Sequence, residues 1–384
     1  MGRSHLTLAA LATSAVPNLE VTQVRQHTYG GSGDFSSAML STPDGNDLII
    51  RIPTTQAAET LQSADLLGLA ALTPGARHNL PFRVAEALGQ TRAGNTRAIV
   101  YTYLDGVKVD GSRITADSTI VPSIARALQA IHNLPSSLIV EAGLPVRSAI
   151  EAREETTRLI ARGEATRLVP SSVLTRWQRV MADRAIWQFH STVVNGALTS
   201  ESFLYDDADS VSGVLDWSQL RVADPATDLA WLAETPGDTM VTVVAEYARL
   251  RDIPDPASLL RRAQFYSELD IVRWLLHGKD THSTEIVDDA VGMLGTLVDR
   301  ISGEAVTEKP VMGVTEAVDL LGQVPGIIPG NQHGADGLLD DPELQRDTDF
   351  DEDDSAEHST STATGPIPVQ GGDAGPTGGS PRTR

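Results

Sequence analysis

Polar and apolar residues alternate along residues 19–27 near the N-terminus, and short stretches at 36–42 and 47–53 follow as further expected strands. A period of two places successive side chains on opposite faces and is typical of β-strands. A turn signal from Pro43 to Gly45 separates the second and third stretches. A further strand is expected at 97–106, where RAIVYTYLDG runs into a turn. The pattern therefore predicts an N-terminal part that is rich in β-structure.

Helical spacing dominates the rest of the folded part. Ile124 and Leu128 fall on one face of a helix predicted at 123–135. Apolar residues return at helical spacing in the charged segment 150–187 and again at 265–278. A β-rich part followed by a helical part indicates an α+β protein with two lobes.

The opening residues 1–17 contain one Arg and a short run rich in Ala and Thr, which superficially resembles a signal peptide. The run passes into the strand at 19–27 with little room for a cleavage region, so we interpret it as a first helix of a cytoplasmic protein, with secretion as the alternative. No uninterrupted apolar run reaches the length of a membrane span, and none is predicted.

The formal net charge of −21 argues against a nucleic-acid partner, because phosphate backbones select basic surfaces. Cysteine is absent, which excludes disulfides, thiolate zinc sites and cysteine nucleophiles. Much of the charge is local, since residues 336–357 hold eleven acidic side chains against the single Arg346. Low hydrophobicity with high charge predicts a disordered acidic tail over 303–384. Its expected role is solubility, or docking of a basic protein partner.

The most informative motif runs through three segments. Residues 193–207 read VVNGALTSESFLYDD, residues 213–217 read GVLDW, and residues 224–232 read DPATDLAWL. This order resembles the catalytic segment of the aminoglycoside and macrolide phosphotransferases, small-molecule kinases of the protein-kinase-like fold. That family carries His-Gly-Asp-Leu, then an Asn or His, then a strand ending in Ile-Asp-Trp, then Asp-Pro and Asp-Leu-Ala. The resemblance extends over about residues 18–300.

The resemblance implies a damaged catalytic site. The family's first His falls at Asn195, its catalytic Asp at Ala197, and its later Asn or His at Ser202, while the second acidic residue survives as Asp216. An alanine cannot orient an attacking hydroxyl, and a serine is a weak ligand for Mg²⁺. We therefore predict no catalytic residue at 197, with Asp216 and weakly Ser202 as metal ligands. Glu201 carries a carboxylate, but neighbouring loop positions point in different directions.

The N-terminal part is expected to bind the nucleotide phosphates. Gly31 and Gly33 lie in YGGSGDF, which is either a phosphate loop or a simple turn. Arg51 in IIRIP stands where the family carries the cation that reaches the phosphates, and its alternative is a solvent-facing arginine. The resemblance places Ser63 where a Glu usually braces that cation, with Glu59 one turn earlier and Asp65 nearby.

The segment after the strand at 97–106 resembles the linker between the lobes. Backbone groups near Tyr103 and Leu104 would face an adenine or guanine, although core packing explains the alternating tyrosines equally well. His132 and His190 are interpreted as packing residues, because no other histidine stands at ligand spacing with them.

Two acidic residues of the last motif segment are assigned structural roles. Asp224 precedes a proline, which favours a turn, and Asp228 precedes a helical run, where it can cap the helix or brace the loop.

These observations predict a β-rich N-lobe at 1–103, a mainly helical C-lobe at 104–302 and the tail at 303–384. Three functions stay open. The first is a pseudokinase that binds ATP or GTP with Mg²⁺ and transfers phosphate weakly or not at all. The second is an active phosphotransferase for a hydroxyl of a small molecule such as an aminoglycoside or macrolide. The third is an interaction protein that needs no nucleotide.

Overall fold

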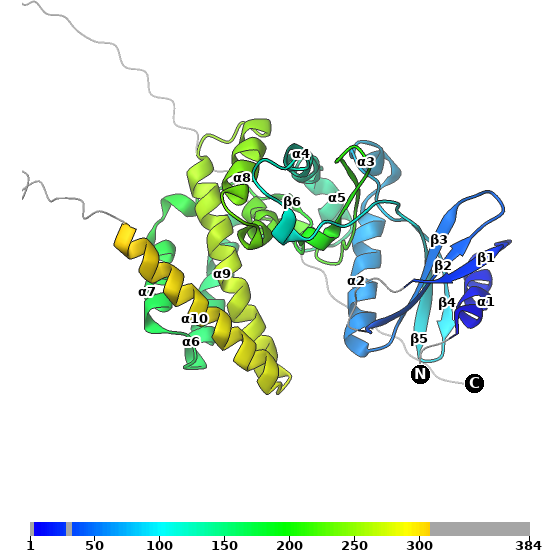
Figure 1. The fold of residues 1–384 in the computed structure, drawn as a ribbon, viewed down its shortest axis with the longest axis horizontal. Coiled ribbons are helices and arrows are strands. Elements are labelled where there is room, and N and C mark those ends of the chain that lie inside the picture. The colour runs from blue at the N-terminus through cyan, green and yellow to red at the C-terminus, as the bar shows by residue number, and fades with distance from the viewer. Residues whose placement is uncertain (1–3, 28–32, 308–384) are drawn as a thin grey trace, which may run out of the picture. The chain divides into compact units, whose positions relative to one another are not determined.

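The computed structural model describes residues 4–27 and 33–307. The chain divides into two units, residues 1–310 and 311–384, and the described residues belong to the first. Within it, a β-sheet formed by the N-terminal part is followed by a mainly helical part, as Figure 1 shows. The predicted two-lobed α+β fold is confirmed. The predicted tail lies outside the described residues from 308 onward, and residues up to Thr307 belong to the last helix.

The N-lobe contains one antiparallel sheet of five strands in the order β1-β2-β3-β5-β4. The register pairs Arg51 with Ser37 on one side and with Ile99 on the other, so Arg51 lies in the middle of the sheet. The strands are β1 (Gln23–Gln26), β2 (Phe35–Ser41), β3 (Asp47–Pro53), β4 (Ala87–Ala93) and β5 (Thr96–Thr102).

The first helix, α1 (His5–Ala15), packs on this sheet. Its N-cap Ser4 accepts the main-chain N–H of Thr7, which satisfies one of the free donors of the first turn. Leu8 and Ala12 are buried in a small apolar core with side chains of β2, β3, β4 and β5. The predicted first helix is therefore present and closes one face of the sheet (Figure 1).

The helix α2 (Gln56–Ala71) follows β3 and begins at the N-cap Thr55. Its Gly68 lies so close to the C-lobe that an added Cβ would stand 2.0 Å from the carbonyl oxygen of Trp217. No side chain fits in that space, so a glycine is required for this packing. A short helix, α3 (Pro74–His78), comes next.

The C-lobe contains two long helices, α9 (Pro256–Asp280) and α10 (Thr284–Thr307). The predicted helix at 123–135 is α4, the charged region 150–187 forms α6 and α7, and residues 265–278 lie within α9. The other helices are α4 (Val121–His132), α5 (Ser136–Glu141), α6 (Ala149–Ala165), α7 (Ser171–Ala182) and α8 (Thr239–Leu250), with short 3-10 helices η1 (Gly111–Arg113), η2 (Ala185–Trp187), η3 (Ser200–Ser202) and η4 (Pro225–Glu234).

Two short antiparallel strand pairs hold the motif segments at the lobe boundary. Strand β6 (Thr192–Val194) pairs with β9 (Arg221–Ala223), and β7 (Phe203–Tyr205) pairs with β8 (Val211–Val214). The loop between β6 and β7 carries residues 195–202, and the loop after β8 carries Asp216. The predicted lobe boundary at 103 and 104 falls just after β5 and stays a prediction.

Buried polar contacts fix these loops. Asp228, fully buried in η4, accepts the main-chain N–H of Asn195 and of Gly196, each at 2.7 Å, and lies 3.1 Å from Nε2 of His132. Asp224 is also buried and accepts a hydrogen bond at 2.8 Å from Arg262. The structural roles predicted for Asp224, Asp228 and His132 are confirmed. None of the described helices combines the length and apolarity needed to cross a bilayer.

Replacing Asp228 with Asn should lower the free energy of unfolding by roughly 1–3 kcal/mol. The amide has a single acceptor oxygen, so its NH₂ group would face one of the two main-chain N–H donors of Asn195 and Gly196. Denaturant unfolding measures this loss. Asp238→Asn is the control, because that exposed N-cap makes no side-chain capping bond, and it should change stability by less than about 0.5 kcal/mol. Equal stability of the two variants would contradict the structural role.

Candidate functional site

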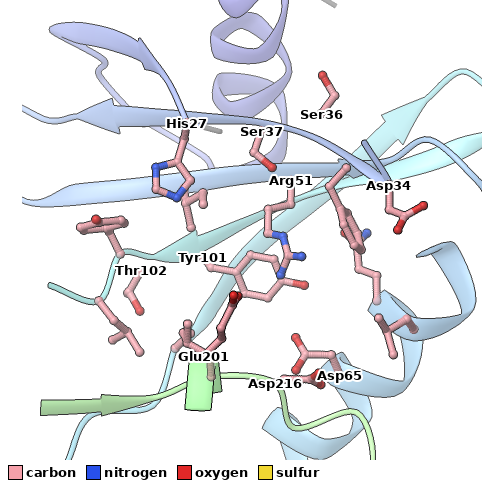
Figure 2. Close-up of a pocket in the computed structure, with 18 of the residues that line it drawn as sticks. His27, Asp34, Ser36, Ser37, Arg51, Asp65, Tyr101, Thr102, Glu201 and Asp216 are labelled. Atoms are coloured by element: carbon pink, nitrogen blue, oxygen red, sulfur yellow. The ribbon is translucent and has the colours of Figure 1, made fainter. Parts of the chain in front are cut away.

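A cavity of about 1410 Å³ lies between the sheet, α2 and the C-lobe loops. It brings together most of the residues that the sequence predicted for nucleotide and metal binding. Gly33, Arg51, Asp65 and Tyr103 come from the predicted N-lobe, and Leu104, Glu201, Ser202 and Asp216 come from the predicted C-lobe. Figure 2 shows Arg51 reaching from the sheet into this cavity, with Asp65 and Asp216 on the opposite wall.

The loop at 195–202 is anchored at its first residue. Asn195 is fully buried, and its side-chain amide donates at 2.7 Å to the carbonyl oxygen of Asp216. Its side-chain oxygen accepts the N–H of Ala197 at 3.2 Å. Asn195, at the position of the family's His, thus connects this loop to the loop that carries Asp216.

Residue 197 offers only a methyl group. Ala197 is half-buried and does not line the cavity, so no proton acceptor stands at this position of the loop. Ser202 lines the cavity, but the residue is only 5% exposed. Its hydroxyl accepts the N–H of Thr199 at 3.1 Å. Because the hydroxyl already stabilises its own loop, Ser202 is poorly suited to binding a metal ion.

The Glu201 side chain points into the cavity (Figure 2), beside Ser202 in the sequence. Its carboxylate lies 3.5 Å from Nζ of Lys108, and Glu201 remains 71% exposed. Neighbouring loop positions were expected to point in different directions, yet both Glu201 and Ser202 line the cavity. Lys108 is a site residue that the sequence analysis missed, because only the fold brings residues 108 and 201 together.

Asp216 adopts a left-handed backbone conformation, with φ +58. Its Oδ1 accepts the N–H and the hydroxyl of Ser218, at 3.1 and 2.6 Å. Within residues 4–27 and 33–307, no Arg, Lys or His nitrogen lies within ion-pair distance of Asp216, so no cationic side chain there neutralises its charge. The second carboxylate oxygen is therefore available to a ligand.

Arg51 is half-buried, and its guanidinium lies 4.1 Å from the ring centroid of Phe35. A cation stacked on an aromatic face is held in place without losing its charge. Within the part of the chain that the structure describes, no carboxylate reaches ion-pair distance of Arg51. Arg51 lines the cavity and does not lie on the outer surface of an edge strand, as the alternative interpretation had it.

The residues of α2 that line the cavity are not the ones that the resemblance placed beside Arg51. Ser63 accepts a hydrogen bond from Arg97 at 2.7 Å and is absent from the cavity wall, as is Glu59. Gln62 and Asp65 line the cavity instead. Their i, i+3 spacing places both residues on one face of the helix. This spacing is visible in the sequence, but the sequence does not say that this face of α2 is the one that meets the cavity.

Asp65 lies next to Asp216 because its Oδ1 accepts the N–H of Trp217 at 2.8 Å. Burial raises the pKa of Asp65 to about 6, and the nearby Asp216 charge adds to the rise, whereas the Trp217 N–H and Arg51 oppose it. A carboxyl with this pKa is ionised at neutral pH and responds to charge placed beside it.

The segment after β5 forms the end of the cavity where a base would lie. Thr102, Tyr103 and Leu104 line it, and the carbonyl oxygen of Tyr103 accepts a hydrogen bond from Arg83 at 3.0 Å. His27 stands edge-on to the Tyr103 ring, with centroids 5.7 Å apart. Burial, followed by Arg51 and Lys108, lowers the pKa of His27, which favours the neutral ring. Flat apolar walls with main-chain polar groups suit a nucleobase.

Gly33 adopts φ +83, which favours glycine, and its carbonyl oxygen accepts the hydroxyl of Thr54 at 2.6 Å. It lines the cavity next to Asp34 and Phe35. Gly31, the other predicted phosphate-loop residue, lies outside the described residues.

No group of three or more His, Cys, Asp or Glu side chains that could hold a metal ion occurs among residues 4–27 and 33–307. A metal at this site would therefore depend on one or two carboxylates, completed by other oxygen donors. Mg²⁺ is compatible with such a set, because it often keeps several waters and takes one or two carboxylates together with substrate phosphates.

Comparison with known proteins agrees with this geometry. A family model described as "Phosphotransferase enzyme family" matches residues 29–266. Viomycin phosphotransferase of Streptomyces vinaceus is 29% identical over 175 residues, which are 42% of this chain and 60% of that protein. The chain thus spans less than two thirds of that relative.

Two solved structures show the fold. The apoenzyme of macrolide 2'-phosphotransferase MphH from Brachybacterium faecium superposes with a TM-score of 0.62 at 22% identity, covering 76% of this chain and 98% of that one. The GDP and kanamycin complex of APH(2")-IIia superposes with a TM-score of 0.62 at 15% identity, covering 76% and 98%. The protein-kinase-like fold expected from the motif is confirmed. With the family model matching well over half of its length, the chain belongs to the phosphotransferase enzyme family.

Proposed function

We propose that this chain is a pseudokinase of its family, which binds a nucleotide in the cavity and transfers phosphate weakly or not at all. The observation that carries the proposal is Ala197, a methyl group where the family's motif carries the carboxylate that orients the attacking hydroxyl. The loop around it keeps its anchors, through Asn195 to Asp216 and through Gly196 to Asp228. In this proposal the loop keeps its anchors and loses the carboxylate at 197.

Nucleotide binding is supported by three groups on the cavity wall. Arg51 supplies a positive charge for phosphate oxygens, and Tyr103 and Leu104 offer main-chain groups and an apolar surface for a base. The relative bound to GDP and kanamycin supports the same use of the cleft here, with ATP or GTP as the nucleotide.

A Mg²⁺ ion would be held by Asp216, whose Oδ2 makes no hydrogen bond among the described residues, rather than by Ser202. When bound, such an ion neutralises the charge on the phosphates. Asn195 holds the carbonyl oxygen of Asp216, and this keeps the carboxylate pointing at the cavity.

The size of the expected defect separates this proposal from an efficient enzyme. Losing a positioned acid–base group typically costs about 10²–10⁴ in rate. A metal site with one ligand fewer adds to the loss, although effects within one site are not additive. Any acceptor is proposed to be a small molecule with a hydroxyl group, as viomycin phosphotransferase and the macrolide enzyme suggest by their names.

Mg-ATP or Mg-GTP should stabilise the full-length protein, by about 2.7 kcal/mol when the nucleotide stands at 100 times its Kd. Arg51→Ala should lose most of this effect because it removes the phosphate-facing charge, and Asp216→Asn should lose the part that depends on Mg²⁺. Thermal unfolding with and without nucleotide measures both. Asp44→Asn, in the exposed turn between β2 and β3, is the control and should behave as the parent protein. Absence of any shift at millimolar nucleotide would contradict the proposal.

Ala197→Asp should raise nucleotide turnover, by about 10²-fold or more if the missing carboxylate is the main defect. Release of phosphate or ADP by the purified variant, compared with the parent protein, measures the gain. Ala197→Asn is the matched control, since it adds a side chain of similar size without a proton acceptor. Equal turnover of the Asp and Asn variants would show that the defect lies elsewhere in the site.

A second candidate function is an active phosphotransferase in which Glu201 supplies the carboxylate. The observation that favours it is that the Glu201 side chain points into the cavity. Glu201→Gln should then abolish acceptor-dependent nucleotide consumption while leaving nucleotide affinity within about a factor of a few. A parent protein without turnover for any hydroxylated acceptor would exclude this candidate. The third function, docking through the tail, concerns residues outside the described part and stays a prediction.

A further inference from the structure

Four oxygen-bearing side chains gather on the cavity wall where α2 meets the loop after β8. They are the carboxylates of Asp65 and Asp216, the amide of Gln62 and the hydroxyl of Tyr101. Figure 2 shows Tyr101 extending between Arg51 and the two carboxylates. The mechanism expected of the family motif uses Asp216 alone of these four.

Each carboxylate has one oxygen engaged and one free. Oδ1 of Asp65 accepts the N–H of Trp217, and Oδ1 of Asp216 accepts from Ser218. Neither Oδ2 takes part in a hydrogen bond within the described part of the chain, and no cationic nitrogen there reaches ion-pair distance of either residue. Two adjacent negative charges of this kind repel each other unless a positive ligand lies between them.

Each of the two neutral side chains is buried and has one oxygen without a partner among the described residues. Gln62 is 5% exposed, and its Nε2 donates to the carbonyl oxygen of Arg97, whereas its Oε1 has no partner among the described residues. Tyr101 is 3% exposed, and its hydroxyl also lacks a partner there. A buried polar atom without a partner costs about 1–3 kcal/mol, and a bound water or ion at the site would remove that cost. An amide oxygen can only accept, and it therefore calls for a donor or a cation.

We propose that Asp65 and Asp216 together bind a divalent cation of the Mg²⁺ type without any nucleotide, with the oxygens of Gln62 and Tyr101 facing the same site. Carboxylate and amide oxygens are the ligands that hard cations prefer. The proposal rests on the proposed function only in sharing Asp216. It assigns to α2 a second metal ligand in addition to Asp216, in place of the Asn or His that the family motif carries at the position of Ser202, whose hydroxyl accepts the N–H of Thr199.

The two carboxylates are held on elements that cannot separate easily. Gly68 of α2 packs against the main chain of Trp217, and Asp65, one turn earlier, bonds the N–H of the same residue. Asn195 fixes the carbonyl oxygen of Asp216 from the other side. A site built this way needs little rearrangement when the ion binds, which favours affinity.

Binding of Mn²⁺ to the full-length protein without nucleotide tests the proposal, followed by the loss of the free-ion signal in electron paramagnetic resonance. One site is expected in the parent protein, and Asp65→Asn and Asp216→Asn should each weaken it by about tenfold or more. Asparagine still accepts the N–H of Trp217, so the Asp65 variant keeps its fold contact. Asp44→Asn, an exposed turn residue, should bind as the parent does. Parent-like affinity in Asp65→Asn, or no binding at millimolar Mn²⁺, overturns the proposal.

Nucleotide titration in EDTA separates this role from a simple bracing of Arg51. If Asp65 acts through the cation, Asp65→Asn and the parent protein bind nucleotide equally once divalent ions are removed. A loss of nucleotide affinity in EDTA would show that Asp65 acts on Arg51, and would overturn the cation site. Mn²⁺ binding without any nucleotide binding would instead support the cation site while contradicting the proposed function.

Discussion

The site depends on the buried carboxylate of Asp228, which accepts hydrogen bonds from two main-chain N–H groups at once. Both donors belong to the turn that opens the loop at 195–202, and the carboxylate lies in a segment more than thirty residues later. His132 of α4 reaches the same carboxylate. A helix, a loop and the η4 segment therefore share one buried charge, and the shape of the loop follows from where that charge lies.

The hydrogen bonds that anchor this loop do not involve the side chain at 197. Ala197 contributes a main-chain N–H to the Asn195 side chain, and that bond does not depend on the residue's own side chain. The fold of the loop is therefore compatible with different side chains at 197. Fold and chemistry at this position can vary separately, because they rest on different atoms.

Much of the site was predictable from sequence because the motif fixes local order. Arg51, Tyr103, Leu104, Ser202 and Asp216 all line the cavity as expected. The error concerned α2, where Ser63 was placed at the bracing position. Sequence spacing groups Gln62 with Asp65 but does not say which face of the helix meets the cleft. That choice is made by contacts with Trp217, 152 residues away from Asp65, and no local pattern records them.

The glycine at 68 also limits how the two lobes can move. Because the backbone of α2 touches the Trp217 carbonyl group, this helix cannot slide or swing on its own over the C-lobe. Any change in the width of the cleft that keeps this contact would therefore take place away from it, nearer the segment that follows β5. The wall formed by Asp65 and Asp216 would then keep its dimensions, because Asp65 and Gly68 both contact Trp217.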